Sequence, residues 1–567
     1  VVSYQPKHMR DVYAKQNEFL LHDDALATAS QKTLEEEPGL LAEDRQKEVS
    51  RSASMMSVLV IISRLTGFAR TWAQSIAVGT TVLASCYAIA NTLPDQLYEL
   101  VGAGMLTTAF LPVYMSIKKK IGKEGANAYT SNLLSIVVIA TLLTSVLGFV
   151  FAGQVIYTQS FSANVEFDSE LAIYFFRFFA IEIVLYCFST IFSGVLNAER
   201  SYFWPMAAPI FNNFITTASF IAYALLARTY PSVGLLILAL GNPLGVLVQV
   251  LVQVPSLKKN GIKLRLRIDL HDPALKDTLK IGAPALIVVI ANFITVSVQN
   301  SSQLSVSAAG GAISNYARLW YTLPYAILTV PLTTALFTEL SDNWAKKNIA
   351  AFKRDLTQGI CQILLFTVPF MLYLIAFSVP LISIISSRQF EAEDILLTAE
   401  FLSGLSLALP LYGVGMYLQK VCSAMRRMTL YAVAATLGSG VQVALLIFGT
   451  PYFGLGFVAA TSAIFNVIID VVMLLALRRR LGHIGLVSMA FAFVRSLGLG
   501  LLGSAVAVLI MRVLEAFIGP VIGSPLRGLI NCVAAGIPAV LVTYGLAVIF
   551  KLPEAAAIRS LLGRLRR

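Results

Sequence analysis

This chain of 567 residues is poor in charge and poorer still in histidine. Lys, Arg, Asp and Glu together make up 13% of it, about half of the share found in soluble domains. There are four histidines and five cysteines, with no CxxC spacing and no Cys/His cluster, so neither a zinc site nor a disulfide framework is expected. No GxxxxGK[ST] phosphate loop occurs, which argues against direct ATP hydrolysis.

Hydrophobic residues are abundant instead, at 57% of the chain, and the mean hydropathy is +0.75. From residue 53 onward we count fourteen apolar segments long enough to cross about 30 Å of hydrocarbon. The sequence therefore predicts an all-α integral membrane protein of about 14 transmembrane helices. Basic residues gather in the connections after even-numbered segments, which predicts that both termini are cytoplasmic. These clusters explain the net charge of +12 as an orientation signal, so no nucleic-acid partner is expected.

A short pattern occurs twice along the chain. Leu93-Pro94 precedes LTTAF at 106–110, and Leu323-Pro324 precedes LTTAL at 332–336. The two copies fall in segments two and eight, which predicts two pseudo-symmetric six-helix lobes followed by two C-terminal helices; transporters built from such repeats carry their site between the halves. The predicted parts are a flexible cytoplasmic tail at 1–52, an N-lobe at 53–255, a basic cytoplasmic connector at 256–275, a C-lobe at 276–477, the last two helices at 478–550 and a basic cytoplasmic tail at 551–567.

Two arginines, Arg64 and Arg70, lie inside the first apolar segment. A charged side chain at bilayer depth costs about 2.5 to 3.5 kcal/mol on insertion scales, so such residues usually face a cavity or a polar partner. A guanidinium offers forked donors that match phosphate oxygens. The two side chains lie about 120° apart around a helix, so they can reach one broad cavity but not one narrow stripe. The alternative is that one of them pairs with a buried carboxylate and locks helices together.

Four stretches, in order, resemble the lipid II flippases of the MurJ/MviN type, within the multidrug/oligosaccharidyl-lipid/polysaccharide exporter superfamily. Residues 63–70 resemble the SRxxGFxR string of that family, and residues 93–113 resemble its LPN…EGAF…AFxPV segment. Residues 194–213 resemble GxLNA…PxxNN, and residues 454–482 resemble its twelfth helix and the basic loop that follows.

The resemblance implies a two-lobed transporter, not an enzyme, in the bacterial inner (cytoplasmic) membrane. It would move undecaprenyl-diphosphate-linked muropeptide (lipid II) from the inner to the outer leaflet by alternating access. An ion gradient or the membrane potential would drive it, and the two helices at 478–550 would form an apolar groove for the lipid tail. The partners expected are the lipid-linked precursor, membrane lipids and, through the N-terminal tail, cell-wall synthesis proteins.

The candidate substrate-binding residues are Ser63, Arg64, Arg70, Glu99 and Arg318. Arg318 resembles the cavity arginine of the family on its eighth helix, one position out of register, whereas Glu99 belongs to a Tyr-Glu pair where the family usually has arginines. Acidic family positions are replaced as well, for example by Ser85. The cationic site is therefore thinner than in the family, so either the head group differs or charge comes from elsewhere, such as Arg177.

Other polar and ionisable residues also stand inside apolar segments. Arg177 and Glu182 are five residues apart, which favours a structural ion pair within the fourth segment. Asn466 and Asp470, at i and i+4 on one helix face, are the best candidates for a coupling cation such as sodium, since hard cations prefer oxygen ligands. The alternative for Asp470 is a hydrogen bond to a neighbouring helix. No other cofactor and no other metal site is expected.

Other functions stay open at this point. A related transporter would export another polyprenyl-linked glycan, or exchange drugs against cations. A polyprenyl-phosphate-processing enzyme is disfavoured, because no paired acidic motif or His/Asp constellation occurs near either membrane surface. A non-transporting scaffold would recruit cell-wall enzymes through residues 1–52, and degenerate site residues are what such a protein would show.

Overall fold

The computed structural model describes residues 39–387, 389–425, 427–555 and 559, without the side chains of 39–54, 57, 103–109 and 280–285. Every regular element in these residues is a helix, and none is a strand. The prediction of an all-helical fold is thereby confirmed. Most of the predicted N-terminal tail, residues 1–38, lies outside the described residues, and its last part belongs to the first helix, which begins at Gly39.

Two series of helices follow each other along the chain. The first comprises α3 (Gly39–Val78), α4 (Val82–Tyr98), the π-helix η1 (Glu99–Ala103), α5 (Gly104–Val150), α6 (Ala152–Ser160), α7 (Ser169–Phe179), α8 (Glu182–Ala198), α9 (Phe203–Leu226), α10 (Pro231–Leu251) and α11 (Val254–Lys259). The second comprises α12 (Pro273–Val306), α13 (Gly310–Pro324), the π-helix η2 (Tyr325–Thr329), α14 (Val330–Ala345), α15 (Ile349–Ala376), α16 (Ser378–Ile385), α17 (Ala392–Ser406), α18 (Leu409–Ala424), α19 (Met428–Leu481), α20 (Leu486–Ile518), α21 (Pro525–Ile549) and the 3-10 helix η3 (Pro553–Ala555).

The helices account for the predicted membrane spans. Within the described residues nine helices are long and apolar enough to cross a membrane, or eleven if each of the bent pairs α7–α8 and α17–α18 is one span. The 54 residues of α19 would extend about 81 Å if straight, far more than one hydrocarbon core. Gly454 breaks this helix with a φ of 71°, so it provides two spans. The other two predicted spans correspond to α3 and to the segment from α4 to the break in α5 at Gly122.

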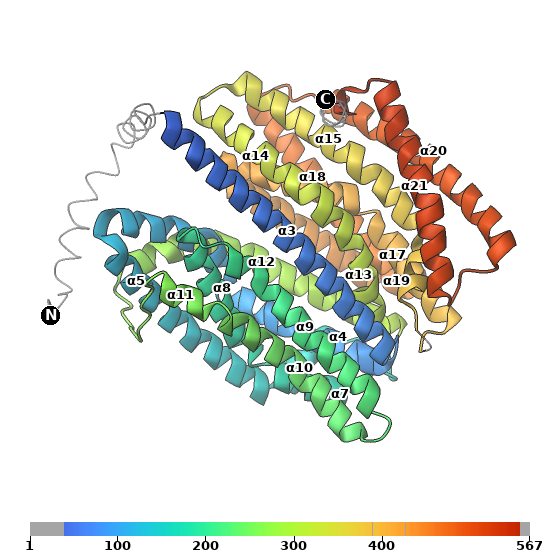
Figure 1. Cartoon of the computed structure of the whole chain (residues 1–567), viewed down its shortest axis with the longest axis horizontal. Coiled ribbons are helices and arrows are strands. Elements are labelled where there is room, and N and C mark those ends of the chain that lie inside the picture. Colours follow the sequence, from blue (N-terminus) through green and yellow to red (C-terminus); the bar gives the residue numbers. More distant parts are fainter. Residues whose placement is uncertain (1–38, 388, 426, 556–558, 560–567) are drawn as a thin grey trace.

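Figure 1 shows how these spans are arranged. In this view α3 runs between one group of helices that includes α4 and α5 to α11 and another that includes α13 to α19, while α20 and α21 stand at one edge of the molecule. The long helix α12 packs against α5 of the first group and against α19 of the second. The predicted two-lobed architecture therefore has α3 and α12 at the junction of the lobes.

The internal repeat has a structural counterpart. In α4 a proline, Pro94, is followed by the π-helix η1, and in α13 the matching Pro324 is followed at once by the π-helix η2. Proline removes a backbone hydrogen bond from the helix, and π-helical turns are rare and often occur at functional sites. The two pseudo-equivalent spans thus carry the same local irregularity, although η1 begins several residues farther from its proline.

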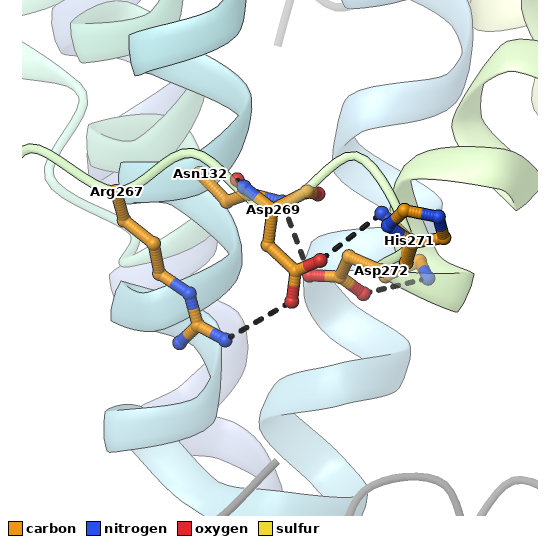
Figure 2. A network of polar contacts seen from close by, with 6 residues as sticks. Asn132, Arg267, Asp269, His271 and Asp272 are labelled. Atoms are coloured by element: carbon orange, nitrogen blue, oxygen red, sulfur yellow. Dashed lines mark hydrogen bonds and ion pairs between the residues drawn. The ribbon is translucent and has the colours of Figure 1, made fainter.

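The connector between the lobes is hydrogen-bonded to α5, with Asn132 at the centre of the contacts (Figure 2). Ser131 and Ser135 of α5 accept from the backbone N–H groups of Arg265 and Arg267, each at 3.1 Å. The side chain of Asn132 accepts a hydrogen bond from the backbone N–H of Asp269 at 2.7 Å and donates one to the carbonyl of the same residue at 2.9 Å. It also donates to Asp272, which caps the start of α12 by accepting from the N–H of Ala274. The basic connector is therefore docked on the N-lobe along 265–272.

Hydroxyl groups join the two lobes near the Val78 end of α3. We refer to these contacts as the hydroxyl seam. Each joins an element of the first series to one of the second, and the donor–acceptor distances range from 2.6 to 2.9 Å. The pairs are Ser75 Oγ to the Ile385 carbonyl, Ser387 Oγ to the Ser75 carbonyl, Thr80 Oγ1 to Asp394, Tyr316 OH to the Gly79 carbonyl, and Ser162 Oγ with Ser301 Oγ.

Candidate functional site: the central cavity and its apolar neighbour

A cavity of about 510 Å³ lies between the two lobes. Its walls come from α3, α4, α8, α9 and α10 on one side and from α12 and α13 on the other. We call it the central cavity. Its lining is dominated by polar side chains, which include Arg70, Gln74, Asn91, Asp95, Asn300, Asn315 and Arg318.

The two arginines of the central cavity face it from opposite lobes at similar depth. Arg70 stands eight residues before the end of α3 at Val78, and Arg318 stands eight residues after the start of α13 at Gly310. Asn315 of α13 donates a hydrogen bond to Gln74 of α3 at 3.2 Å, and Arg318 and Arg70 each lie about one helical turn beyond this contact. Two guanidinium groups are therefore available to one anionic ligand, which is the arrangement that a diphosphate requires.

The only hydrogen bond found for the Arg318 guanidinium within the described residues is a long one. Its Nη2 donates to Gln299 Oε1 at 3.4 Å, and neither Arg318 nor Arg70 forms an ion pair there. Most of the donor capacity of both groups is therefore open to a ligand. The charge of Arg70 nevertheless acts on the buried carboxyl of Glu182, so the alternative in which a first-helix arginine pairs with a buried carboxylate stays open.

The other candidate substrate residues lie outside the central cavity. Arg64 is exposed, six residues before Arg70 on α3, and its charge acts on Tyr325 of η2. The carbonyl of Ser63 accepts a hydrogen bond from Asn213 at 3.2 Å, which ties α3 to α9. Glu99 is the first residue of η1, and the charge of Asp95 acts on it. Asp95 lines the central cavity, whereas Glu99 does not. The structure thus brings together Arg70 and Arg318, and leaves the roles of the other three as predictions.

A buried carboxylate network behind the cavity was missed by the sequence reasoning. Glu182 of α8 is fully buried, and Asn242 of α10 donates to its two oxygens at 3.0 and 2.9 Å. Tyr186 donates to the same carboxylate at 3.2 Å, and Asn242 also bonds to Asn91 of α4. Asn242, Tyr186 and Asn91 all line the central cavity. The one signal in the sequence was an asparagine before a proline within an apolar segment.

The predicted ion pair between Arg177 and Glu182 is wrong. The Arg177 guanidinium lies 5.9 Å from the ring centroid of Phe149, whereas Glu182 takes its hydrogen bonds from Asn242 and a tyrosine. The physical reason is the helix break between them, because α7 and α8 meet at a bend of 41°. A five-residue spacing already turns the two side chains about 140° apart on a straight helix.

A second hollow, of about 500 Å³, lies beside α13 on the side of α15, α16 and α21. We call it the apolar groove. Its lining is almost entirely apolar and includes Trp320, Phe370, Phe377, Val533, Ile537 and Leu541. The prediction placed a lipid-tail groove in the last two helices; this hollow uses only the second of them, α21, together with helices of the C-lobe.

Asn466 and Asp470 are both buried on α19, with side chains directed at α18. A β-carbon on Gly415 would lie 3.2 Å from Asp470 Oδ1 and 3.8 Å from Asn466 Oδ1. Among the described residues Asp470 Oδ1 has no hydrogen-bond partner, and Asn466 uses its amide N–H to donate to the Ser462 carbonyl at 2.7 Å. Two side-chain oxygens thus converge on one point of the α18 backbone.

Comparison with known proteins gives a consistent result. A family model described as lipid II flippase MurJ matches residues 74–522. The lipid II flippase MurJ of Burkholderia cenocepacia is 26% identical over 374 residues, covering 65% of this chain and 70% of the relative. A probable lipid II flippase MurJ of Borreliella burgdorferi is 22% identical over 453 residues, covering 79% of this chain and 87% of the relative.

Solved structures agree on the fold. A lipid II flippase MurJ in an inward closed conformation superimposes with a TM-score of 0.69 at 20% identity, covering 87% of this chain and 99% of that one. An inward-facing multidrug resistance transporter of the MATE family gives a TM-score of 0.61 at 16% identity, covering 75% of this chain and 94% of that one. Since the family model matches residues 74–522, well over half of the chain, this chain belongs to the lipid II flippase MurJ family.

Proposed function

We propose that this protein flips lipid II, the undecaprenyl-diphosphate-linked peptidoglycan precursor, from the inner to the outer leaflet by alternating access. The observation that carries the proposal is the pairing of Arg70 and Arg318 across the central cavity, at one depth and from opposite lobes. A diphosphate bound between them would touch both moving halves of the transporter. The adjoining apolar groove suits the polyprenyl tail of the same molecule.

The orientation belongs to the proposal as well. With both termini in the cytoplasm, the basic connector at 256–275 and Arg478–Arg480 lie on the inner side, as the positive-inside rule requires. The hydroxyl seam then closes the outer end of the path between the lobes. In this state lipid II would enter from the inner side.

The test is complementation of bacteria depleted of their own lipid II flippase. Wild type is expected to restore growth, and Arg70→Ala and Arg318→Ala are expected to fail at equal membrane expression, because each removes a charged hydrogen-bond donor worth about 1.5 to 3 kcal/mol. Arg177→Ala is the matched control, since it removes an arginine of a membrane helix outside the cavity. Arg64→Ala should have an intermediate effect, because Arg64 lies outside the cavity wall but on the same helix as Arg70, with its charge acting on Tyr325 of η2.

Each remaining outcome has a definite meaning. Full rescue by Arg70→Ala and Arg318→Ala would contradict the central cavity as the head-group site. Failure of well-expressed wild type would favour another polyprenyl-linked substrate or a scaffold for cell-wall proteins. Deletion of residues 1–38 separates these two, because a scaffold that recruits partners through the tail loses its function and a transporter keeps it. The deletion stops before α3, which begins at Gly39.

We also propose that a monovalent cation binds at Asn466 and Asp470 and that its gradient drives transport. Support comes from the converging oxygens at Gly415 and from the unpartnered Asp470 Oδ1. Sodium should raise the Tm of purified wild type by a few degrees relative to potassium, and Asp470→Asn should abolish that difference. Asp342→Asn, at an exposed aspartate paired with Lys346, is the control. Equal Tm values in both salts for wild type would exclude this site and leave the membrane potential as the driving force.

A further inference from the structure

A third hollow, which shares no lining residue with the central cavity or the apolar groove, opens where α15, the start of α20 and η3 meet. Its volume is about 640 Å³, and we call it the basic pocket. Four basic side chains line it, namely Lys353, Arg354, His483 and Arg495. Arg354 forms an ion pair with Asp355, with 3.7 Å between Nε and Oδ1. Lys353 forms no ion pair within the described part of the chain. The pocket is therefore suited to an anion.

The basic pocket continues into an apolar channel along α20. A neighbouring hollow of about 840 Å³ is lined by Leu499, Leu501, Leu502, Phe550 and Leu552, and Arg495 borders both spaces. We call this second space the α20 groove. Gly498, which has no other atom within 4 Å of where a β-carbon would stand, leaves it open just below Arg495. In Figure 1, α20 and α21 stand at the edge of the molecule, where lipid surrounds them in a membrane.

One carboxylate complements the basic residues. Glu554 of η3 is 7% exposed, and its Oε1 accepts from Arg495 Nη1 at 3.2 Å. Its Oε2 is buried and has no hydrogen-bond partner among the described residues. A buried carboxylate oxygen without a donor is costly, so a cationic or N–H group that reached it through a small rotation of the Glu554 side chain would be stabilised. The basic pocket thus offers contacts for a phosphate and for an amine side by side.

We propose that the basic pocket and the α20 groove together bind one phospholipid whose head group carries a phosphate and an amine. The phosphate lies against Lys353 and Arg495, the ammonium faces Glu554 Oε2, and the acyl chains run along Leu501, Leu502 and Phe550. The lipid belongs to the inner leaflet under the orientation proposed above. Such a lipid fastens α20 to α15 and η3 and takes no part in moving substrate.

The experiment uses the purified full chain and native mass spectrometry with phosphatidylethanolamine and phosphatidylglycerol as probes. Wild type should retain at least three times more phosphatidylethanolamine. Arg495→Ala should lower retention of this lipid at least fivefold, and Glu554→Gln should lower it to the level of phosphatidylglycerol. Arg512→Ala, at an exposed arginine near the other end of α20, should leave retention unchanged. Because no transport is measured, the result is independent of lipid II flipping.

Two further measurements, on the Gly498→Leu variant and on binding of the head group alone, test the proposal if Arg495→Ala is poorly folded. Gly498→Leu fills the α20 groove, so it should lower retention of the lipid without changing the binding of O-phosphoethanolamine, the head group alone. O-Phosphoethanolamine should bind wild type far more weakly than the lipid does. Equal retention of both lipids by wild type and all variants, or a head group that binds as tightly as the whole lipid, would overturn the proposal.

Discussion

The central cavity and the apolar groove are nearly equal in size and opposite in chemistry. The first holds about 510 Å³ and is lined by arginine, asparagine, glutamine and aspartate; the second holds about 500 Å³ and is lined by aromatic and aliphatic side chains. Helix α13 separates them, with Arg318 on the cavity side and Trp320 on the groove side. Residues i and i+2 of an α-helix are rotated about 200° from each other around the helix axis. The same helix therefore presents a charge to the cavity and an aromatic ring to the groove.

This difference shows how a single chain receives a molecule with a charged head and a long apolar tail. Each half of such a ligand finds a surface of its own kind, and neither surface can serve the other half. Arginine binds a phosphate through geometry and charge, whereas the groove acts through burial of apolar area, which has no directional requirement. The contrast predicts that the contributions of the head group and of the lipid tail to binding affinity can be abolished separately.

The largest effect is expected from the arginines. Replacing both Arg70 and Arg318 by glutamine should weaken binding of a polyprenyl diphosphate at least about 100-fold, since each charged contact contributes about 1.5 to 3 kcal/mol. Binding of the corresponding polyprenol, which lacks the diphosphate, should stay unchanged. Fluorescence titration of purified protein with the two lipids measures both values. An equal loss for both lipids would mean that the variant distorts the protein rather than the head-group site.

A smaller effect is expected from filling the apolar groove. Gly536 of α21 lines the groove, and a β-carbon there would be 3.9 Å from Phe377. Gly536→Phe should displace two or three methylenes of the tail, each worth about 0.8 kcal/mol, and so weaken binding of both the diphosphate and the polyprenol about 15- to 60-fold. Gly545→Phe, on the same helix with open space around it and outside the groove lining, is the control. Unchanged polyprenol binding in Gly536→Phe would contradict a tail site at this position.

The smallest effect is expected away from both hollows. Glu199, just past α8, accepts hydrogen bonds from Lys118 and Tyr114 at 2.7 Å. Partial burial works to raise the pKa of Glu199, but these two donors and the nearby lysine charges outweigh it, so the net pKa lies below the ordinary 4.5. The contact is therefore fully stabilising above pH 4.5 and is lost as the pH falls through the lowered pKa.

The variant Glu199→Gln should consequently lower thermal stability by at most about 1 kcal/mol at neutral pH and flatten the loss of stability on acidification. Differential scanning fluorimetry of purified protein across acidic and neutral pH provides the measurement. Binding of the diphosphate and of the polyprenol should not change. A shift in either affinity would show that the Ala198 end of α8 is coupled to the transport path.

Much of the architecture was predictable because the local amino-acid composition determines which segments can span a membrane. The limits of the spans and the repeat at Pro94 and Pro324 follow from apolar runs and from a short pattern within each helix. Arg70 was identified because a charge inside an apolar segment is conspicuous on its own. In contrast, Glu182 and Asn242 meet across 60 residues of chain, and no spacing on one helix reveals such a pair. The apolar groove likewise depends on α21 docking against α15 and α16, which periodicity cannot indicate.

The hydroxyl seam has a consequence for how easily the lobes can part. Four of its five hydrogen bonds contribute only about 0.5 to 1.5 kcal/mol each, because water replaces the lost partner when the hydroxyl is exposed. The fifth, from Thr80 to the Asp394 carboxylate, contributes about 1.5 to 3 kcal/mol. Shifting a two-state equilibrium from 1:99 to 99:1 takes about 5.5 kcal/mol of differential binding. A seam of small hydroxyls is therefore weak enough for one bound ligand to open, and removing a single hydroxyl would change the resting balance of states several-fold.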